Sequence, residues 1–429
     1  MTANQSLRRR FFNSLTRGTG EAYLLYKQYP EIDFSDLIIK GSVQNYAFDD
    51  QCEGSRASYM WRFIKGNKQR DRIVTAVLQQ LTEDEENGGN LEQMCDLAVQ
   101  FHQAGFKSAR KVLNEKFEKN VLNELGYAGT RQVMEVGGLE VVMRVARVIG
   151  KKLYIDKSDS ESSYNLDEFA KNHKELDVYH ELEKAAATSK YVKTYFDSVR
   201  ANKWSLPTVQ NIPRFSYQII KQRIDNRQMR FMSKSRADEL STEEVINLAK
   251  DFLRETDMAK KELYLRFFSK RKFPLSYKPI LEIARGRNPS KTRMVEFAVG
   301  SLKYFSGKDI RLLALEKIRK TRNPSEYLEL LVGTYKKGDH KLLLEVAHRS
   351  SNQNFIHSLV SGFLEVYRAN PTTDCKEPLE AFYNRMNCGI HRCDIVRLLK
   401  ENNVLSEAIF KELQYDSEEN LRKFYRKHK

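Results

Sequence analysis

Three side chains that can bind a soft metal ion lie close together near the C-terminal end of the sequence, at Cys388, His391 and Cys393. Thiolate and imidazole groups are the donors of structural zinc sites, which use four of them. Cys375 is the nearest further cysteine, but the resulting pattern Cys-x12-Cys-x2-His-x-Cys matches no zinc module. We therefore expect no metal here. The segment is instead predicted to begin a helix whose buried side is formed by Ile395, Val396, Leu398 and Leu399.

A second group of reactive side chains is formed by Asp49, Asp50 and Glu53, which flank the thiol of Cys52. Neighbouring carboxylates can transfer protons or bind a hard cation. No histidine lies close to them in the sequence, and the group directly precedes residues 55–61, which are predicted to be helical. Because acidic residues at the start of a helix interact favourably with its dipole, we favour a capping role.

Motifs of the common enzyme classes are missing from the sequence. The glycine pairs at Gly18 and Gly20 and at Gly137 and Gly138 lack the strand and the spacing of a phosphate-binding loop, and are interpreted as turns between helices. No GxxxxGK[ST], G-x-S-x-G, H-E-x-x-H or protein-kinase signature occurs. We therefore name no catalytic residue and no cofactor, and favour a protein that is not an enzyme.

Positive charge is concentrated in the middle of the chain. The formal net charge is +16, and residues 201–320 hold 27 Lys and Arg against 13 Asp and Glu, whereas the rest holds 46 against 44. Such a stretch favours a polyanionic partner, either nucleic acid or an acidic protein. The alternative is a solvated surface that keeps the protein soluble. The candidate polyanion-binding residues are Lys260, Lys261, Arg266, Lys270, Arg271, Lys272, Lys278, Arg285, Arg287, Lys291 and Arg293.

Aromatic side chains are interleaved with these cations, at Phe267, Phe268, Phe273 and Tyr277. Aromatic rings between cations can stack on nucleic-acid bases. On helices with this spacing they are more often part of the core, and we favour that interpretation.

Other features of the composition indicate the cellular environment of the protein. Five scattered cysteines without the spacing of a disulfide framework favour a reducing, cytoplasmic location. No apolar run is long enough to span a membrane, because Arg144 and Arg147 interrupt the best candidate, residues 141–149. Arginines without acids in the first twenty residues are also found in transit peptides, but Phe11, Phe12 and Leu15 favour a structural helix. The oligomeric state is not predicted.

The elements that must position these residues are predicted to be helices. A chain of 429 residues is too long for one compact core unless it grows as a repeat array, and 9 prolines with 20 glycines are few for a many-stranded β protein. Ser241 and Glu244 form a capping box, and the apolar residues Val245, Leu248, Ala249 and Phe252 follow at helical spacing.

The tetrapeptide RNPS occurs twice, starting at Arg287 and Arg322, 35 residues apart. Each copy precedes an apolar helical pattern, a glycine turn and a second helical pattern. Asn is a favoured N-cap and Pro a favoured first helical residue, so Asn288 and Asn323 are predicted to cap two successive helix pairs. Another helix pair is predicted at residues 91–117 around Ala104-Gly105, and further helices at 138–149, 394–400 and 416–425.

The predicted helix pairs have short turns, a drifting period and an arginine early in the second helix, as in Asp309-Ile310-Arg311 and Asn420-Leu421-Arg422. These features resemble those of HEAT-type helical repeats. The resemblance covers about two thirds of the chain. It implies an all-α fold, an α-solenoid of stacked antiparallel helix pairs in one or two segments, used as a non-enzymatic binding scaffold. HEAT-like DNA glycosylases give the alternative, a DNA-processing enzyme. In that case Trp61 or Trp204 and a carboxylate should converge in a basic groove.

The middle of the chain departs from this repeat pattern. Residues 156–163 are polar and are predicted to form a loop, residues 165–190 are acidic and helical, and residues 204–213 contain two prolines and are predicted to be irregular. A second acidic loop is predicted at residues 83–90. The predicted domains are 1–155 with N-terminal helical repeats, 156–213 as linker and irregular segment, and 214–429 with basic C-terminal repeats.

Overall fold

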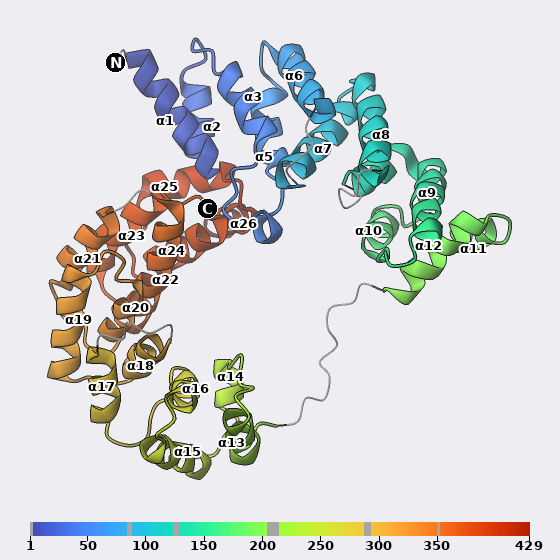
Figure 1. The fold of residues 1–429 in the computed structure, drawn as a ribbon. Helices are drawn as coiled ribbons and strands as arrows, with labels where there is room; N and C mark the ends of the chain where they lie inside the picture. Colours follow the sequence, from blue (N-terminus) through green and yellow to red (C-terminus); the bar gives the residue numbers. More distant parts are fainter. Residues whose placement is uncertain (1–2, 84–87, 123–127, 204–213, 287–292, 350–351) are drawn as a thin grey trace. The chain divides into compact units, whose positions relative to one another are not determined.

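The computed structural model describes the chain except for residues 1–2, 84–87, 123–127, 204–213, 287–292 and 350–351. Within that part of the chain every regular element is helical, with 26 α-helices and three short 3-10 helices (Figure 1). Consecutive helices pack against one another, which confirms the predicted all-α fold of stacked helix pairs. None of the described helices is both long enough and apolar enough to cross a membrane.

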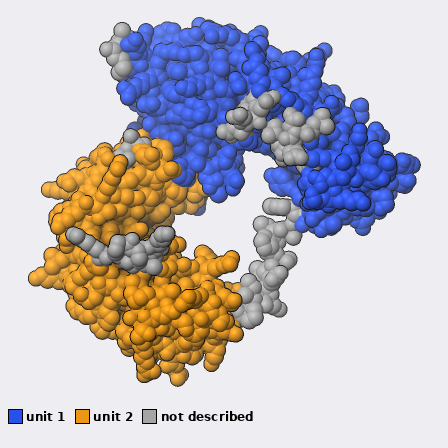
Figure 2. All heavy atoms as spheres, viewed as in Figure 1, with its two compact units in different colours: residues 1–208, 387–389, 407–429 blue, residues 209–386, 390–406 orange. Residues whose placement is uncertain are grey.

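The helices form two compact units (Figure 2). Unit 1 comprises residues 1–208, 387–389 and 407–429, and unit 2 comprises residues 209–386 and 390–406. The helices of unit 1 are α1 (Ala3–Arg17), α2 (Glu21–Gln28), α3 (Ser35–Val43), α4 (Asp50–Glu53), α5 (Ala57–Ile64), α6 (Arg70–Glu83), α7 (Gly88–Gln103), α8 (Lys107–Leu122), α9 (Thr130–Ile155), α10 (Tyr164–Asn172), α11 (Val178–Ala186), α12 (Lys190–Ala201), α25 (Glu407–Glu412), η3 (Leu413–Tyr415) and α26 (Glu419–His428).

Unit 2 contains the basic part of the sequence. Its helices are α13 (Tyr217–Asp225), α14 (Lys234–Ala237), α15 (Thr242–Arg254), α16 (Met258–Phe268), α17 (Lys278–Arg285), α18 (Met294–Leu302), α19 (Lys308–Lys320), α20 (Ser325–Leu328), η1 (Glu329–Leu331), α21 (Asp339–His348), α22 (Gln353–Ala369), η2 (Thr373–Cys375), α23 (Lys376–Tyr383) and α24 (Gly389–Glu401), which starts at the boundary between the units.

Unit 1 has a continuous apolar core that runs from α1 to α12. Phe11 of α1 is fully buried, and its ring lies 4.2 Å from that of Phe34 and 5.8 Å from that of Phe63, measured between centroids. The first segment of the sequence is therefore a structural helix, as its apolar pattern predicts. The predicted pair around Ala104-Gly105 is also confirmed, as α7 and α8.

The glycine pair in α9 marks a break in that helix. Gly138 has a φ of 64°, which an L residue rarely adopts, and the helical geometry resumes after it. This confirms the predicted turn at Gly137 and Gly138 and the predicted helix over 138–149. Residues 156–163 form the predicted loop, and α10 and α11 cover the acidic stretch that follows. The predicted irregular segment 204–213 lies outside the described residues. Of the loop predicted at 83–90, residues 84–87 also lie outside them, whereas Glu83 ends α6 and residues 88–90 begin α7, so these positions are helical and the predicted loop bounds were too wide.

Unit 2 is built from helix pairs that hydrogen-bond to later pairs. The capping box at Ser241 and Glu244 is present, and the four apolar residues predicted on α15 are buried. The hydroxyl of Ser301 on α18 donates to the carbonyl of Leu265 on α16 at 3.2 Å. Arg311 on α19 donates to both carboxylate oxygens of Asp339 on α21, at 2.7 and 2.8 Å. Such links fix each pair onto a neighbour, as expected for stacked repeats.

The second RNPS segment begins a helix, but one residue later than predicted. Pro324 occupies the N-cap position of α20, with φ −88° and ψ 14°, and Ser325 is the first helical residue. The side chain of Asn323 still accepts a hydrogen bond from the amide of Ser325, at 3.2 Å. The helix is also short and continues as the 3-10 helix η1. The first RNPS segment, with Asn288, lies outside the described residues.

Candidate polyanion-binding site

The structure places most of the predicted polyanion-binding residues in ion pairs within unit 2. Arg287 and Lys291 lie outside the described residues. Of the others, six have a carboxylate nearby: Lys260 with Asp225 at 3.1 Å, Arg266 with Glu262 at 3.8 Å, Arg271 with Asp238 at 2.7 Å, Lys278 with Asp309 at 2.5 Å, Arg285 with Glu282 at 2.8 Å and Arg293 with Glu296 at 2.7 Å. Much of the positive charge in this stretch is therefore balanced locally.

Three of these cations lie over aromatic rings of neighbouring helices or turns. The guanidinium groups of Arg266 and Arg293 each lie 4.9 Å from the ring centre of Phe297. The ammonium group of Lys272 lies 5.3 Å from the ring of Phe305. These rings are occupied by the protein's own cations. Sequence analysis did not identify either ring.

The interleaved aromatic residues are core residues, as the favoured interpretation expects. Phe267 and Phe268 are fully buried and Phe273 is 1% exposed. The Phe268 and Phe273 rings lie 4.7 Å apart, edge to face. Tyr277 is half-buried and donates its hydroxyl to Asp309 at 3.0 Å. The three phenylalanines are therefore unable to stack on nucleic-acid bases.

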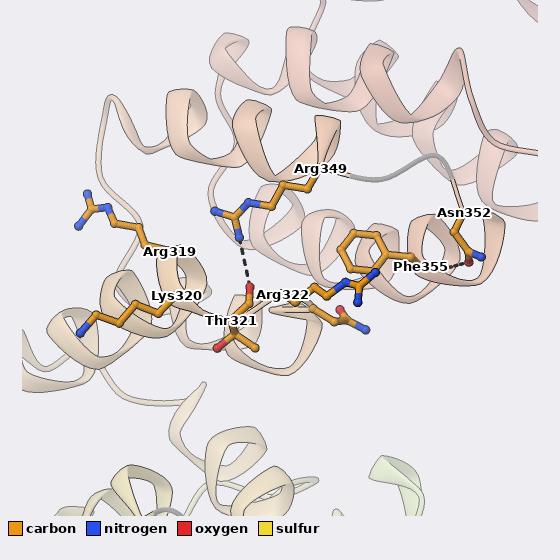
Figure 3. Close-up of a pocket in the computed structure, with 8 residues that line it drawn as sticks. Arg319, Lys320, Thr321, Arg322, Arg349, Asn352 and Phe355 are labelled. Atoms are coloured by element: carbon orange, nitrogen blue, oxygen red, sulfur yellow. Dashed lines mark hydrogen bonds between the residues drawn. The ribbon is translucent and has the colours of Figure 1, made fainter.

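A different group of cations lines an open pocket of about 670 Å³ in unit 2, hereafter the basic pocket (Figure 3). Among the described residues, its cationic side chains are Arg319, Lys320, Arg322 and Arg349, and none of the described residues that line it is acidic. Thr321, Asn323, Asn352 and Phe355 complete the lining. The pocket combines guanidinium donors, amide groups and one half-buried aromatic ring. These groups can bind phosphate or carboxylate oxygens.

The basic pocket is positioned by the ends of three helices. Arg319 and Lys320 are the last residues of α19, and Arg322 follows them in the turn before α20. Arg349 follows α21 and donates to the carbonyls of Ile318 at 2.6 Å and Thr321 at 3.3 Å, at the end of α19. These bonds hold a fixed positive charge against the C-terminal carbonyls of α19.

Asn352 and Phe355 form the opposite side of the basic pocket, at the start of α22. The Asn352 side chain accepts a hydrogen bond from the amide of Phe355 at 3.1 Å, which caps the helix. This side therefore presents the N-terminal end of a 17-residue helix, where the dipole favours negative charge.

The cations of the basic pocket differ in how far their charge is compensated. Lys320 pairs with Glu316 at 3.1 Å. Arg319 and Arg322 are exposed, and within the described part of the chain neither forms an ion pair. These two guanidinium groups are the ones best placed to bind an anion from solution.

Sequence analysis did not identify this pocket. Arg322 was recognised only as the first residue of an RNPS segment, and nothing in the sequence marks Arg349. Their proximity depends on the packing of α19, α21 and α22. The sequence feature that points to this part of the chain is the excess of positive charge, which extends to Lys320.

Unit 1 contains a tryptophan with carboxylates beside it, the combination that a glycosylase-like enzyme would need. Trp61 lines a pocket of about 490 Å³ together with Asp96 and Glu135. Among the described residues of that lining, the one lysine or arginine is Arg131, which pairs with Asp96 at 2.6 Å and with Glu92 at 2.8 Å. This pocket is therefore not basic. Trp204 lies outside the described residues.

The acidic group at residues 49–53 has a capping role, as favoured from the sequence. Asp49 accepts hydrogen bonds from the amides of Gln51 and Cys52, both at 3.1 Å, and so caps α4. Glu53 accepts from the amides of Phe48 and Asp49. The helix that is capped is α4 itself, which sequence analysis did not distinguish from the helix that follows.

Comparison with protein-family models, with curated proteins and with solved structures finds no match to this chain.

Proposed function

We propose that this protein is a non-enzymatic helical scaffold that binds a polyanion, specifically the phosphate backbone of nucleic acid, through the basic pocket. The observation that supports this is that four cationic side chains gather there, with no carboxylate among the described residues that line the pocket. The likeness to HEAT-type repeats and a cytoplasmic location, which is compatible with five free cysteines, belong to the same proposal.

Nucleic acid suits the basic pocket better than an acidic protein. Three of its four cations are arginines, whose planar guanidinium groups bind phosphate oxygens in pairs. Phosphates also recur at short, regular intervals, so that several cations can be engaged at once. No recognised base-reading motif occurs in the sequence, so contacts should be to the backbone, with little sequence preference.

The alternative is that these cations only neutralise the carbonyl groups at the C-terminal ends of α19 and α21. Arg349 has this role, since it donates to carbonyl oxygens of α19. Arg319 and Arg322 make no such bond within the described part of the chain. The two interpretations differ in whether replacement of Arg319 and Arg322 weakens the binding of nucleic acid.

A charge-matched pair of triple variants tests the proposal. The pocket variant replaces Arg319, Lys320 and Arg322 by Glu. The reference variant replaces Lys270, Arg271 and Lys272 by Glu, which changes the net charge by the same amount at the stretch that sequence analysis favours. Arg349 stays unchanged, because its backbone hydrogen bonds support the fold. Binding to unrelated DNA and RNA duplexes is measured by fluorescence anisotropy over a range of salt concentrations.

We expect wild type to show a slope of log K against log salt of roughly −3 to −4, as four phosphate contacts require. The pocket variant should bind all duplexes more weakly, with a slope shallower by about three. The reference variant should change less, because Arg271 is paired with Asp238 and Lys272 lies over Phe305. Equal weakening by both variants would contradict a role for the pocket. Preferential binding of polyglutamate over the duplexes would identify an acidic protein as the partner class.

A further inference from the structure

Among the described residues that line the basic pocket, one is aromatic, Phe355 at the start of α22. Its side chain is half-buried, and its exposed part faces the pocket. Elsewhere in unit 2, the rings of Phe297 and Phe305 lie under the protein's own cations, at 4.9 and 5.3 Å. Within the described part of the chain, no lysine or arginine lies over the Phe355 ring in this way. This ring can therefore contact a flat group of a ligand.

We infer that the basic pocket binds single-stranded nucleic acid, with one base stacked on Phe355 while the cations hold the adjoining phosphates. This inference rests on the proposed function and adds the form of the nucleic acid. The faces of bases are accessible in single strands, whereas in a duplex they are stacked on neighbouring base pairs. Because every base has such a face, the contact adds affinity without reading the sequence.

The two sides of the basic pocket match the two parts of a nucleotide. The cations come from the ends of α19 and α21, and Arg319 and Arg322 are exposed there. Phe355 lies on the opposite side, on α22. A nucleotide likewise has a charged phosphate at one end and a flat base at the other. The volume of about 670 Å³ lies within the range of about 300 to 1,000 Å³ that is usual for ligand pockets.

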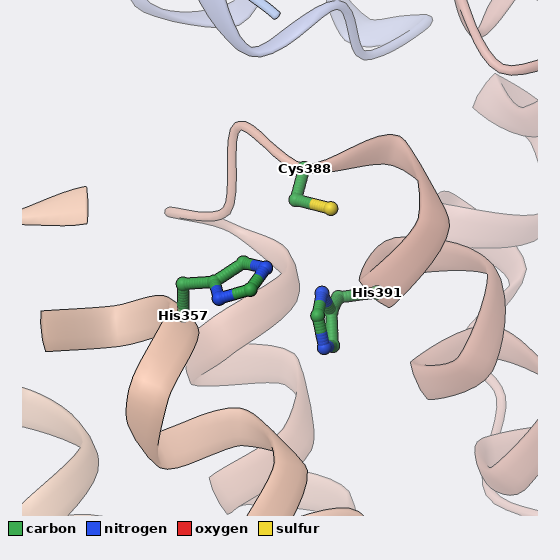
Figure 4. A group of neighbouring side chains, drawn as sticks. All are labelled: His357, Cys388 and His391. Atoms are coloured by element: carbon green, nitrogen blue, oxygen red, sulfur yellow. The ribbon is translucent and has the colours of Figure 1, made fainter. Parts of the chain in front are cut away.

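The first turn of α22, which carries Phe355, is held in place within unit 2. The side chain of Gln353 donates to the carbonyl of Arg385 at 2.8 Å. The rings of His357 on α22 and His391 on α24 lie 4.3 Å apart between centroids, at 79° to each other (Figure 4). An aromatic ring on a fixed helix turn loses little conformational freedom when a base stacks on it.

The two amide side chains of the basic pocket have structural roles. Asn323 accepts a hydrogen bond from the amide of Ser325 at 3.2 Å and donates to the hydroxyl of Ser358 at 3.4 Å. Asn352 caps α22. Since sequence is read through hydrogen bonds to base edges, we expect little preference among the four bases.

Three probes with the same number of phosphates test the inference on the full-length protein, by fluorescence anisotropy at one salt concentration. They are a single-stranded oligothymidylate of about 12 nucleotides, the same strand built from abasic sugars, and a duplex. Wild type should bind the oligothymidylate more tightly than the abasic strand by about tenfold or more, because one base stacks on the ring. It should also bind the oligothymidylate more tightly than the duplex.

Variants at the ring separate stacking from packing. Phe355→Leu keeps an apolar side chain but removes the flat face, so it should lose the preference for oligothymidylate and leave the affinity for the abasic strand unchanged. Phe355→Trp should keep the preference. Phe297→Leu is the matched control, because that half-buried ring is covered by Arg266 and Arg293, and it should change neither affinity.

The pocket variant, in which Glu replaces Arg319, Lys320 and Arg322, distinguishes this inference from the proposed function. It should weaken the binding of all three probes, whereas Phe355→Leu should weaken only that of the strand with bases. The inference is overturned if wild type binds the abasic strand or the duplex as tightly as oligothymidylate, or if folded Phe355→Leu keeps the preference. In either case a loss of binding in the pocket variant would leave phosphate binding by the basic pocket intact. Unchanged binding of every probe by the pocket variant would contradict the proposed function itself, and the inference with it.

Discussion

The carboxyl group of Glu161 lies buried in unit 1, in the loop before α10. Burial disfavours the ionised form and raises the pKa of Glu161 to about 7, although a hydrogen bond from Asn165 at 3.2 Å opposes the shift. The unfolded chain ionises this group near its ordinary pKa of 4.5. Its contribution to stability is therefore fully present below pH 4.5 and is lost as the pH rises through 7.

Replacing Glu161 by Gln should remove this pH dependence while keeping the shape of the side chain. Between pH 5 and pH 8, the free energy of unfolding of wild type should fall relative to that of the variant by about 2 to 3 kcal/mol. Urea denaturation of both proteins at the two pH values measures this difference. A difference that stays constant with pH would show that Glu161 ionises normally in the folded protein.

Interactions between residues that are near in sequence could be predicted, and those between distant residues could not. The capping box of Ser241 and Glu244 spans three residues, and its geometry follows from the local backbone. The approach of Arg349 to the end of α19 depends on the packing of α21, which no local pattern encodes. For this reason Arg349 could not be identified from the sequence as part of the basic pocket.

The close packing of α9 and α12 depends on a glycine. A Cβ atom added at Gly150 would overlap the carbonyl oxygen of Tyr191 and contact the Cβ of Tyr195, both on α12. The two helices can approach closely only because this position has no side chain. Gly66 is a suitable reference, because it is exposed, faces open space and belongs to the same unit.

Gly150→Ala should destabilise the protein by about 1 to 3 kcal/mol, because the backbone of α12 must move away. Gly66→Ala should have a much smaller effect on the free energy of unfolding. Thermal and urea denaturation, followed by the helical circular dichroism signal, provide the comparison. Equal stability of the two variants would mean that α9 and α12 are not in this close contact.

Helices with a regular apolar period could be predicted from the sequence, whereas their ends could be predicted less exactly. Periodic apolar residues gave α15, α18 and α19, because burial of one helix side is a local property of the pattern. The start of α20 was misplaced by one residue, since Pro324 precedes the helix instead of occupying its first position. Both proline positions satisfy the same sequence preference, and the tertiary packing selects between them.

At the scale of the whole molecule, the C-terminal segment belongs to the same unit as the N-terminal helices. The amide of Ser417 donates to the carbonyl of Gly18 at 2.7 Å, and the rings of Tyr415 and Tyr23 lie 4.6 Å apart. The helix predicted over 416–425 corresponds to α26. Its placement against the start of the chain was not predicted, because no repeat pattern links segments about 400 residues apart.

Gly20 is the point at which this long-range contact can be tested. It has ordinary right-handed helical angles, so valine can adopt its backbone conformation, but a Cβ atom there would overlap the carbonyl oxygen of Glu412. Gly20→Val should therefore push the segment 407–415 away from α2. We expect destabilisation of about 1 to 3 kcal/mol from this overpacking.

Hydrogen exchange followed by mass spectrometry distinguishes this effect from a local change in α2. In Gly20→Val, amides of α25 and α26 should exchange faster together with those of α2, because each loses the surface that covers it. Gly66→Val, which has open space around it, controls for the substitution itself. Faster exchange confined to α2 would contradict the joining of both chain ends in unit 1. Faster exchange in both segments would instead show that the two ends of the chain stabilise each other within unit 1, through a contact that spans nearly the entire sequence.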